Sequence, residues 1–382
     1  MTKTIQKSLA LLWLLTSSTA CGTLGLVGGT DVDAVATSVQ KPANVAVYLK
    51  VTEDDDPVTD LELKNFEITE NDQALAPEDI GLRLLPRRTL ANERVVLLVD
   101  ISGKPNQELR RSLASAVEGF VEKVRTEVPV SVLAYDGSPG LKPIGEYPQA
   151  AAGEAAPKAD LLETMTAVDE SRDFYGAIIK GVKELDVRMM QQKKPLHVAT
   201  LVVFARGPDL AGRTTEFQVD EALTDKNYDV IGIGVGDEAP YLEDVSDAGL
   251  FLAHKAETLP IVFEDAAARV LATRGQYYVL AYCSPARAGT RTLRVNVRYT
   301  AKDNDDHHGS YYTEFEAQGF GPGCNSETPP RFVVPRPANE AAPQAAASEP
   351  APSPAEATSS SPAPAAAKEG EVAPPPDKPA YK

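Results

Sequence analysis

The side chains best placed to do chemistry follow a short apolar run in the first half of the chain. Val95 to Val99 is a continuous apolar stretch, and Asp100, Ser102 and Lys104 come directly after it. Continuous runs of Val and Leu bounded by turn residues are typical of buried parallel strands. Ligands of open α/β sheets bind at the carboxyl ends of such strands. We therefore expect a functional site around Asp100.

The elements that must position this site lie between residues 91 and 274, where apolar strands alternate with amphipathic helices. Helices are predicted over 107–127, 173–190 and 259–273, and further strands over 128–135, 198–204, 228–235 and the segment ending near 253. Strands that alternate with helices at this spacing predict an α/β domain with a doubly wound, mostly parallel, Rossmann-like sheet.

The segments on both sides of this domain, 42–90 and 275–325, read as strands without helices between them. Strands are predicted over 45–51, 63–69, 80–85, 276–282, 291–299 and 311–316. Neighbouring strands without helical crossovers are antiparallel. We expect the two segments to combine into one small antiparallel β-sandwich beside the parallel sheet.

The first 21 residues are typical of an export signal, with Lys3 and Lys7 before the apolar stretch Leu9 to Leu15. The segment Ser18 to Cys21 resembles the cleavage box of bacterial lipoproteins, in which the cysteine carries the lipid. That resemblance implies a lipid-anchored envelope protein, and Gly22 after the cysteine implies the outer membrane. The alternative is plain secretion, with Cys21 in the removed peptide or left as a thiol.

Two further cysteines and two segments of biased composition complete the domain organisation. If Cys21 carries a lipid, Cys283 and Cys324 are left, and an exported protein is expected to pair them in a disulfide. Residues 22–41, rich in Gly, Thr, Asp and Ala, predict a flexible tether. Residues 326–382, with 14 of the 30 prolines and much alanine, predict a disordered tail.

The composition and motifs exclude several function classes. The formal net charge of −17 argues against binding nucleic acid through its phosphates. The sequence has no G-x-S-x-G, no P-loop and no His-Glu-x-x-His, and Gly232 to Gly236 lacks the full dinucleotide-binding spacing. The acidic turn before His307 and His308 lacks the Gly and Glu of an EF-hand loop. We therefore expect no enzyme activity and no cofactor.

Four segments together resemble bacterial envelope lipoproteins with a von Willebrand factor A domain: 57–68, 97–103, 231–237 and 277–287. The resemblance covers roughly residues 43 to 300 and implies an adhesion or complex-assembly protein. It also implies a divalent cation at the top of the sheet, held by oxygen ligands from three loops and accepting a carboxylate from the partner.

At three of those ligand positions this chain has a cation instead. Lys104 stands at the last hydroxyl position of the D-x-S-x-S motif, Arg172 at the threonine and Arg206 at the second aspartate, while Asp100 and Ser102 are kept. Mg²⁺ requires hard oxygen ligands. The metal site is therefore interpreted as lost, although Ser171 or Asp209 could replace ligands if a loop shifted.

Two hypotheses account for the cationic cluster, and they are compatible. In the first, Arg206 or Lys104 pairs with Asp100 and takes the place of the metal as an internal strut. In the second, the guanidinium groups receive an acidic side chain of a partner protein. The predicted function is thus protein binding or complex assembly without a metal, and the alternative is a Mg- or Mn-dependent adhesin with an atypical site.

Overall fold

A computed structural model describes residues 29–332, apart from 152–153, 155–157, 192–193, 225, 227 and 302–303. The export signal, Cys21 and the tail from residue 333 onward lie outside the described residues. None of the described helices is long and apolar enough to cross a membrane.

The central element is a six-stranded sheet in which five strands run parallel. The strand order is β12-β11-β10-β7-β8-β9, and only β9 is antiparallel to its neighbour. The strands are β7 (Ala91–Asp100), β8 (Val130–Tyr135), β9 (Lys142–Tyr147), β10 (Leu196–Ala205), β11 (Tyr228–Val235) and β12 (Gly249–Ala253). The expectation of a mixed α/β chain with a mostly parallel sheet is confirmed.

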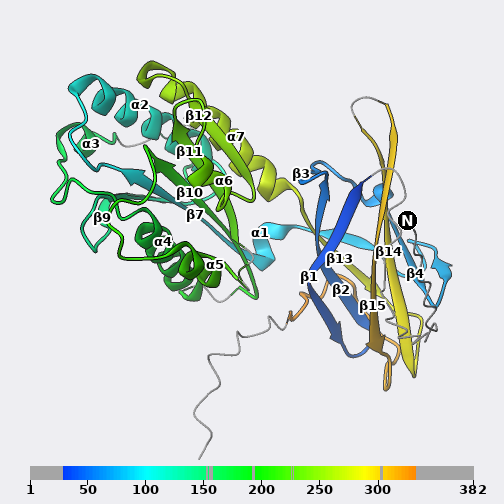
Figure 1. Cartoon of the computed structure of the whole chain (residues 1–382). Coiled ribbons are helices and arrows are strands. Elements are labelled where there is room, and N and C mark those ends of the chain that lie inside the picture. The colour runs from blue at the N-terminus through cyan, green and yellow to red at the C-terminus, as the bar shows by residue number, and fades with distance from the viewer. Residues whose placement is uncertain are drawn as a thin grey trace, which may run out of the picture. The chain divides into compact units, whose positions relative to one another are not determined.

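Helices cover both faces of this sheet, as Figure 1 shows. Successive side chains of a strand point to opposite faces, so Leu97 and Val99 of β7 pack with α2 and α7, while Val96 and Leu98 pack with α4. The helices are α2 (Gln107–Val124), α3 (Leu161–Thr164), α4 (Phe174–Met190), α5 (Glu216–Leu223), α6 (Pro240–Glu243) and α7 (Leu259–Gly275), with the 3₁₀ turn η2 (Ala256–Thr258) before α7.

The strands before and after this domain form two antiparallel sheets, which we call the β module. One sheet has the order β1-β2-β13-β6 with β3 beside β2, and the other has the order β15-β14-β4-β5. Its elements are β1 (Thr30–Gln40), β2 (Asn44–Glu53), β3 (Asp56–Pro57), η1 (Leu63–Asn65), β4 (Phe66–Glu70), β5 (Gln73–Leu75), β6 (Arg83–Leu85), β13 (Tyr277–Cys283), β14 (Thr290–Thr300) and β15 (Asp306–Glu316).

Segments far apart in the sequence pair directly within the β module. Strand β2 pairs with β13, and β4 pairs with β14. The inward side chains of both sheets, such as Val47 and Ile68, belong to one buried cluster. The predicted disulfide between Cys283 and Cys324 is confirmed and links the end of β13 to the segment after β15.

Two predicted unstructured segments are wrong in part. Residues 22–41 were expected to be a tether, but Thr30–Gln40 is strand β1, paired along its length with β2. Residues 326–382 were expected to be disordered, but Ser326 and Phe332 are buried. Residues in both segments gain order from pairing or packing with a neighbour, which composition alone does not reveal.

Aromatic and aliphatic side chains join the β module to the α/β domain. Tyr48 and Tyr277 stack with ring centroids 5.5 Å apart. They belong to one buried cluster with Leu90 of the short helix α1 (Arg87–Leu90), Leu196 of β10 and Phe332.

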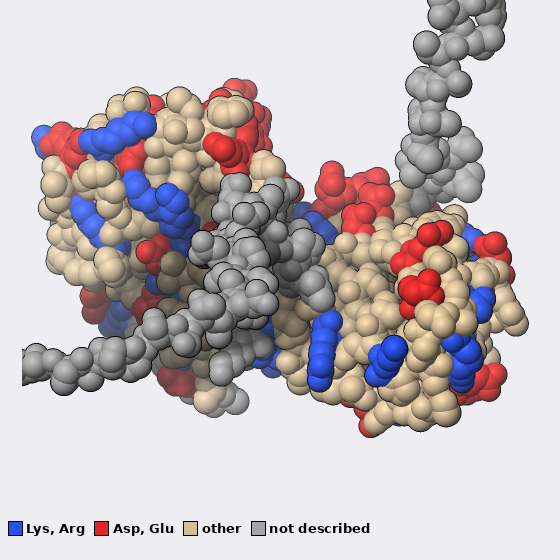
Figure 2. All heavy atoms as spheres, turned by 90° about the horizontal axis from the view of Figure 1, so that it is seen from below, with Lys and Arg blue, Asp and Glu red and all other residues tan. Residues whose placement is uncertain are grey.

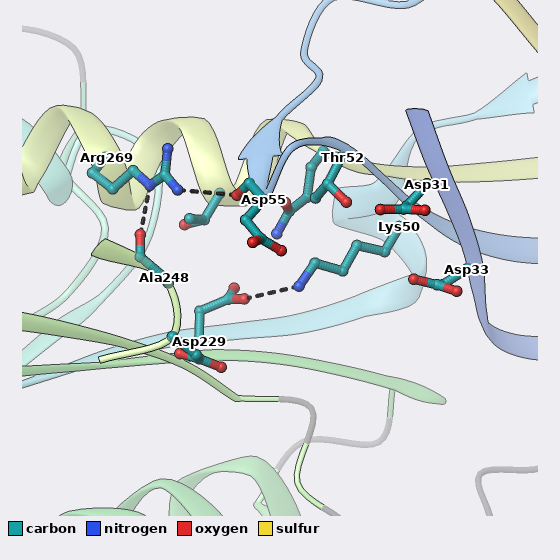
Figure 3. A pocket seen from close by; sticks show the side chains of 11 residues that line it. Asp31, Asp33, Lys50, Thr52, Asp55, Asp229, Ala248 and Arg269 are labelled. Atoms are coloured by element: carbon teal, nitrogen blue, oxygen red, sulfur yellow. Dashed lines mark hydrogen bonds and ion pairs between the residues drawn. The ribbon is translucent and has the colours of Figure 1, made fainter. Parts of the chain in front are cut away.

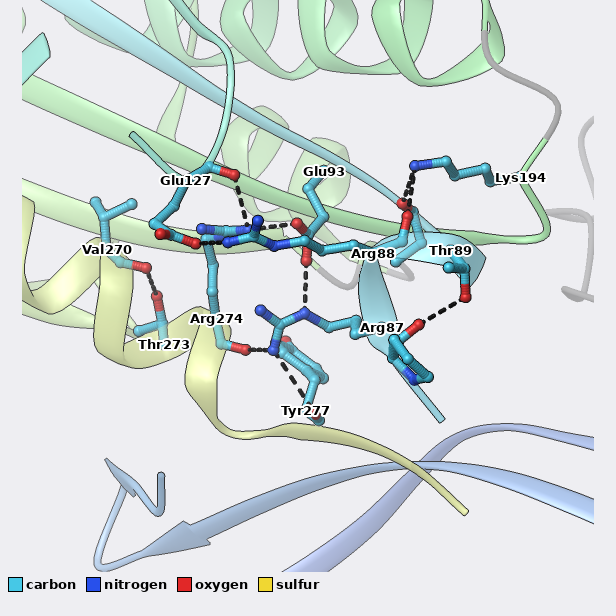
Figure 4. A network of polar contacts seen from close by, with 12 residues as sticks. Arg87, Arg88, Thr89, Glu93, Glu127, Lys194, Val270, Thr273, Arg274 and Tyr277 are labelled. Carbon is cyan, nitrogen blue, oxygen red and sulfur yellow. Dashed lines mark hydrogen bonds and ion pairs between the residues drawn. The ribbon is translucent and has the colours of Figure 1, made fainter. Parts of the chain in front are cut away.

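A polar network borders this cluster (Figure 4). Glu93 of β7 accepts a hydrogen bond from Arg87 Nε at 2.5 Å and forms an ion pair with the buried Arg274. Burial, the largest influence, lowers the pKa of Arg274, and the Glu93 charge opposes that shift. Because a buried guanidinium is costly unless it is paired, Glu93 ties α1 and the end of α7 to the start of the sheet.

Candidate functional site

Asp100 ends β7 at the carboxyl edge of the parallel sheet, and its carboxylate is completely buried. One oxygen, Oδ1, accepts the backbone N–H of Ser102 at 2.8 Å. The other, Oδ2, accepts Arg172 Nε at 2.7 Å and the backbone N–H of Arg206 at 3.0 Å. Hydrogen bonds from ionised donors are among the strongest in proteins, so this carboxylate is held by its own chain on both oxygens.

The two arginines reach Asp100 from different loops. Arg172 precedes α4, and its Nη1 donates to the carbonyl of Pro208 at 3.0 Å. Arg206 follows β10, with its Nε 3.6 Å from Asp100 Oδ2 and its Nη2 bound to the carbonyl of Ser102. The structure therefore brings Asp100, Ser102, Arg172 and Arg206 together, as the resemblance implied.

Lys104 does not take part in this cluster, so its predicted place beside Asp100 is wrong. Its Nζ forms an ion pair with Glu170 Oε1 at 2.7 Å, and its side chain is 81% exposed. The turn after Asp100 passes through Gly103, which has a positive φ of 62°. This turn leaves Lys104 in solvent beside Glu170, and no ion pair joins it to Asp100 among the described residues. The residue that pairs most closely with Asp100 is Arg172, which the strut hypothesis did not single out.

The residues considered as substitute metal ligands are used inside their own loops. Ser171 Oγ donates to Asp169 at 2.8 Å. Asp209 accepts the N–H groups of Gly212 at 2.8 Å and Tyr175 at 3.4 Å. Among the residues that the structure describes, no group of three or more His, Cys, Asp and Glu side chains is arranged to hold a metal ion.

Two polar atoms of the cluster, Ser102 Oγ and Arg206 Nε, have no hydrogen-bond partner within the described chain. Ser102 is 1% exposed, and its Oγ lies unpaired beside the contacts of Asp100 and Arg206. Most buried hydroxyls in proteins are paired with protein or with ordered water. The Ser102 hydroxyl is therefore a buried group whose hydrogen bond the described chain does not supply.

A second buried aspartate, Asp136, was missed by the sequence analysis. It follows β8, accepts Lys142 Nζ at 2.5 Å and the N–H of Val168 at 2.6 Å, and also bonds to Ser138. Although burial raises the pKa of Asp136, these hydrogen bonds outweigh it and hold that pKa well below the usual range. An Asp directly after a second apolar run was the signal that could have revealed it.

The loops around the cluster present both apolar and charged side chains to solvent. Val168 is 79% exposed and Leu210 is 64% exposed. Their loops are linked, because Leu210 N–H donates to the Arg172 carbonyl at 2.8 Å and Arg213 pairs with Asp169 at 3.2 Å. We call Val168, Leu210 and Arg213 the rim of the site.

The described surface shows no single basic face in the view of Figure 2, where Lys and Arg are interspersed with Asp and Glu. Phosphate recognition requires clustered cations. This face therefore lacks the features of a nucleic-acid interface.

Comparison with known proteins gives similarity at the level of solved structures only. No protein-family model and no curated protein matches the chain. It is similar to a von Willebrand factor type A protein from Catenulispora acidiphila, with 11% identity over 76% of this chain and 72% of that one and a TM-score of 0.37. The SpRpn10 VWA domain matches at 12% identity over 44% of this chain and 93% of that one, with a TM-score of 0.33.

A third similar structure is proximal thread matrix protein 1 from the mussel byssus. The identity is 15%, the TM-score is 0.37, and the match covers 47% of this chain. This chain spans about half of the length of that protein, 48%. What is established for the present chain is thus its mixed α/β architecture with a parallel-rich sheet and a buried Asp–Arg cluster at the carboxyl edge.

Proposed function

We propose that the chain is an envelope lipoprotein whose domain of the von Willebrand factor A type binds a partner protein at the carboxyl edge of its parallel sheet, without a metal ion. The observation that carries the proposal is the pairing of Asp100 with Arg172 and Arg206. Two guanidinium groups stand where the resemblance implies a cation, and they retain donors for an acidic side chain of the partner.

The contacts of Asp100 do not fit a divalent cation at this position. Both of its carboxylate oxygens already accept hydrogen bonds, and Oδ2 lies 2.7 Å from a charged guanidinium nitrogen. A cation bound to that oxygen would be repelled by Arg172, and Mg²⁺ needs near-octahedral oxygen ligands that the loops use elsewhere. This favours metal-free binding over the alternative, a Mg- or Mn-dependent adhesin.

Site-specific photo-crosslinking tests the location of the partner. A photoreactive residue at Leu210, on the rim, is expected to give a covalent adduct with one protein in the envelope. The matched control is Met190 at the end of α4, which is 67% exposed but lies away from this edge, since Asn92 at the start of β7 bonds to its neighbour Met189. Equal adducts from both positions, or none from Leu210, would contradict the proposal.

Thermal melting separates metal-free binding from the adhesin alternative. The natural chain should melt at the same temperature with Mg²⁺, with Mn²⁺ and with chelator, because a ligand that does not bind cannot stabilise. The triple variant Lys104→Ser, Arg172→Thr, Arg206→Asp restores the ligand types of the resembled family and should gain a Mg²⁺-dependent rise. A rise of several degrees in the natural chain would favour the adhesin.

The envelope location is proposed from the sequence, since Cys21 lies outside the described residues. Cys21→Ser should move the protein from the membrane fraction to the soluble fraction. Cys283→Ser with Cys324→Ser serves as the control, because these sulfurs form the disulfide and carry no lipid. A Cys21→Ser variant that still fractionates with membranes would rule out the lipid anchor.

A further inference from the structure

The outer side of helix α5 presents a large aromatic side chain to solvent. Its inward residue, Val219, is completely buried in the cluster that α4 also joins. Phe217 lies two residues earlier, about 200° around the helix axis, and is 74% exposed. Single exposed apolar residues are common on protein surfaces, so the surroundings of Phe217 decide what this side of the helix can bind.

Carboxylates gather around this side of α5. Asp220 and Glu221, one turn after Phe217 and on the same side of the helix, are both exposed. Burial, the largest influence, raises the pKa of Tyr175, and four carboxylates raise it further: Glu216, Asp209, Asp244 and Asp220. Among the described residues no ion pair joins any of these carboxylates to a cation, and Lys180 of the neighbouring helix α4 pairs with Asp173 instead. The surface is therefore electronegative.

A pocket of about 340 Å³ adjoins the carboxyl end of α5. Its lining includes the apolar Leu223, which ends α5, and the exposed carboxylates of Glu243 and Asp244. The cation in its lining, Lys226, is neutralised by Asp186, whose two carboxylate oxygens lie 3.0 and 2.9 Å from Lys226 Nζ. An apolar wall beside unpaired carboxylates suits the aliphatic stem and the charged head of a lysine or arginine side chain.

The polar pocket in Figure 3, at the amino edge of the parallel sheet, provides a contrast. There Lys50 points toward Asp229 at 3.7 Å, and Arg269 donates hydrogen bonds to the carbonyls of Ala248 and Asp55. Cations of the chain itself therefore stand among those carboxylates. The carboxylates beside α5 have no such cations within the described part of the chain, so they favour a cationic group from a partner.

We propose that the outer side of α5 and the adjoining pocket form a docking surface for a basic segment of a partner protein. An apolar side chain of the segment packs on Phe217. A lysine or arginine of the same segment enters the pocket, where its stem contacts Leu223 and its charge pairs with Glu243 or Asp244. The six residues from Phe217 to Leu223 span about 9 Å along the helix, so one short segment reaches both places.

This docking surface is independent of the carboxyl edge proposed above as a binding site. It includes neither arginine of the Asp100 cluster, and its charge is opposite to theirs. The proposal therefore holds whether or not that edge binds a partner.

Fluorescence anisotropy of labelled helical peptides with the full chain tests the chemistry of the partner. The probe is a peptide of about 14 residues, long enough for the contact region of α5 and composed of Leu and Lys at amphipathic spacing. Replacing every Lys by Glu removes the charge complementarity, and replacing every Leu by Ser removes the apolar contact. Each change should weaken binding at least tenfold, which corresponds to the loss of about one charge-assisted hydrogen bond or more. No binding of the Leu–Lys peptide, or equal binding of the Leu–Glu peptide, would overturn the proposal.

Variants of the chain locate the binding. Phe217→Ser, and separately Glu243→Gln with Asp244→Asn, change exposed side chains, so the fold is kept, and each should weaken the Leu–Lys peptide about tenfold. The matched controls lie on α7, across the sheet from α5: Ile261→Ser, where Ile261 is 62% exposed, and Glu264→Gln with Asp265→Asn. The controls should bind the peptide as the natural chain does. Equal losses in the controls would show that the peptide follows the net negative charge alone, and unchanged binding in the α5 and pocket variants would contradict this location.

Sedimentation velocity tests the other possible occupant, a second copy of the chain. The natural chain and the Phe217→Ser variant should sediment alike. A dimer of the natural chain that Phe217→Ser dissociates would show that a second copy covers α5, which would overturn the assignment to a basic partner.

Discussion

Two buried aspartates lie at opposite edges of the same parallel sheet, and their surroundings differ. Asp100, at the carboxyl edge, accepts three hydrogen bonds at 3.0 Å or less, one of them from a guanidinium. Asp229, near the start of β11, has Lys50 at 3.7 Å and the Tyr277 hydroxyl at 3.5 Å. The first carboxylate is closely surrounded by donors, whereas the second is buried with distant ones.

This difference in surroundings affects the pKa of Asp229. Burial, the largest influence, raises its pKa to about 6, and Lys50 offsets that rise only in part while the Asp247 charge adds to it. The comparison shows that burial alone does not decide the protonation state of a carboxylate. The number and distance of donors around it decide whether its charge is supported.

The largest expected loss of stability comes from removing the cation closest to Asp100. Arg172→Met leaves a buried carboxylate without its closest cation and should lower the free energy of unfolding by about 3 kcal/mol. Urea unfolding measures this loss. Asp100→Asn combined with Arg172→Met removes the charge as well and should recover part of the stability. A loss below about 1 kcal/mol would show that the backbone donors and Arg206 suffice to support Asp100.

The second prediction concerns the pH dependence set by Asp229. Its folded pKa of about 6 lies above the unfolded value of about 3.9, so the folded state binds the proton more tightly. Its contribution to stability is present below pH 4 and is lost as the pH rises through 6, a change of up to about 3 kcal/mol.

Asp229→Asn should remove this part of the pH dependence, measured by urea unfolding at pH values between 4 and 7. Asp237→Asn changes an exposed carboxylate and should leave the profile as in the natural chain. A profile in Asp229→Asn that follows the natural chain would show that another group titrates in this window.

A smaller effect on stability is expected from replacing Lys50. This residue is the only cation paired with Asp229 among the described ion pairs. Lys50→Met removes an attraction that favours the charged carboxylate, so the pKa of Asp229 should rise above 6. At neutral pH the loss of this partly exposed pair should cost about 1 kcal/mol or less. Carbon-13 NMR titration of Asp229 measures the pKa, and an unchanged value would contradict the contribution of Lys50.

The smallest effect is expected at Lys104, because it pairs with Glu170 in solvent rather than with Asp100. Lys104→Ala should leave the urea midpoint unchanged within error, since exposed ion pairs contribute little. A loss comparable to that of Arg172→Met would mean that Lys104 turns inward to Asp100, as the sequence alone had suggested.

The parallel sheet was predictable because its signal is local. Apolar runs such as Val198 to Phe204 are confirmed within about two residues at each end. Strand β1 was not predictable in the same way, because its small and polar residues gain order only from pairing with β2. Strand β9 and helix α5 were also missed, since neither has a strong apolar run.

The candidate site was likewise predictable only in part. The apolar run placed Asp100 and Ser102 at the carboxyl edge of the sheet, and the family resemblance added Arg172 and Arg206 to them, which the contacts confirm. The direction of Lys104 was not predictable, since it depends on the conformation of Gly103.

The pairing of β6 with β13 has a mechanical consequence. The α/β domain is an insertion whose entry and exit strands lie side by side, with Leu85 opposite Val279. A force that pulls on the chain at β1 and at Phe332 is carried from strand to strand through the β module and across the Cys283–Cys324 link. The inserted α/β domain branches from this frame between β6 and β13, so the strand-to-strand path of such a force does not run through the carboxyl edge of the parallel sheet.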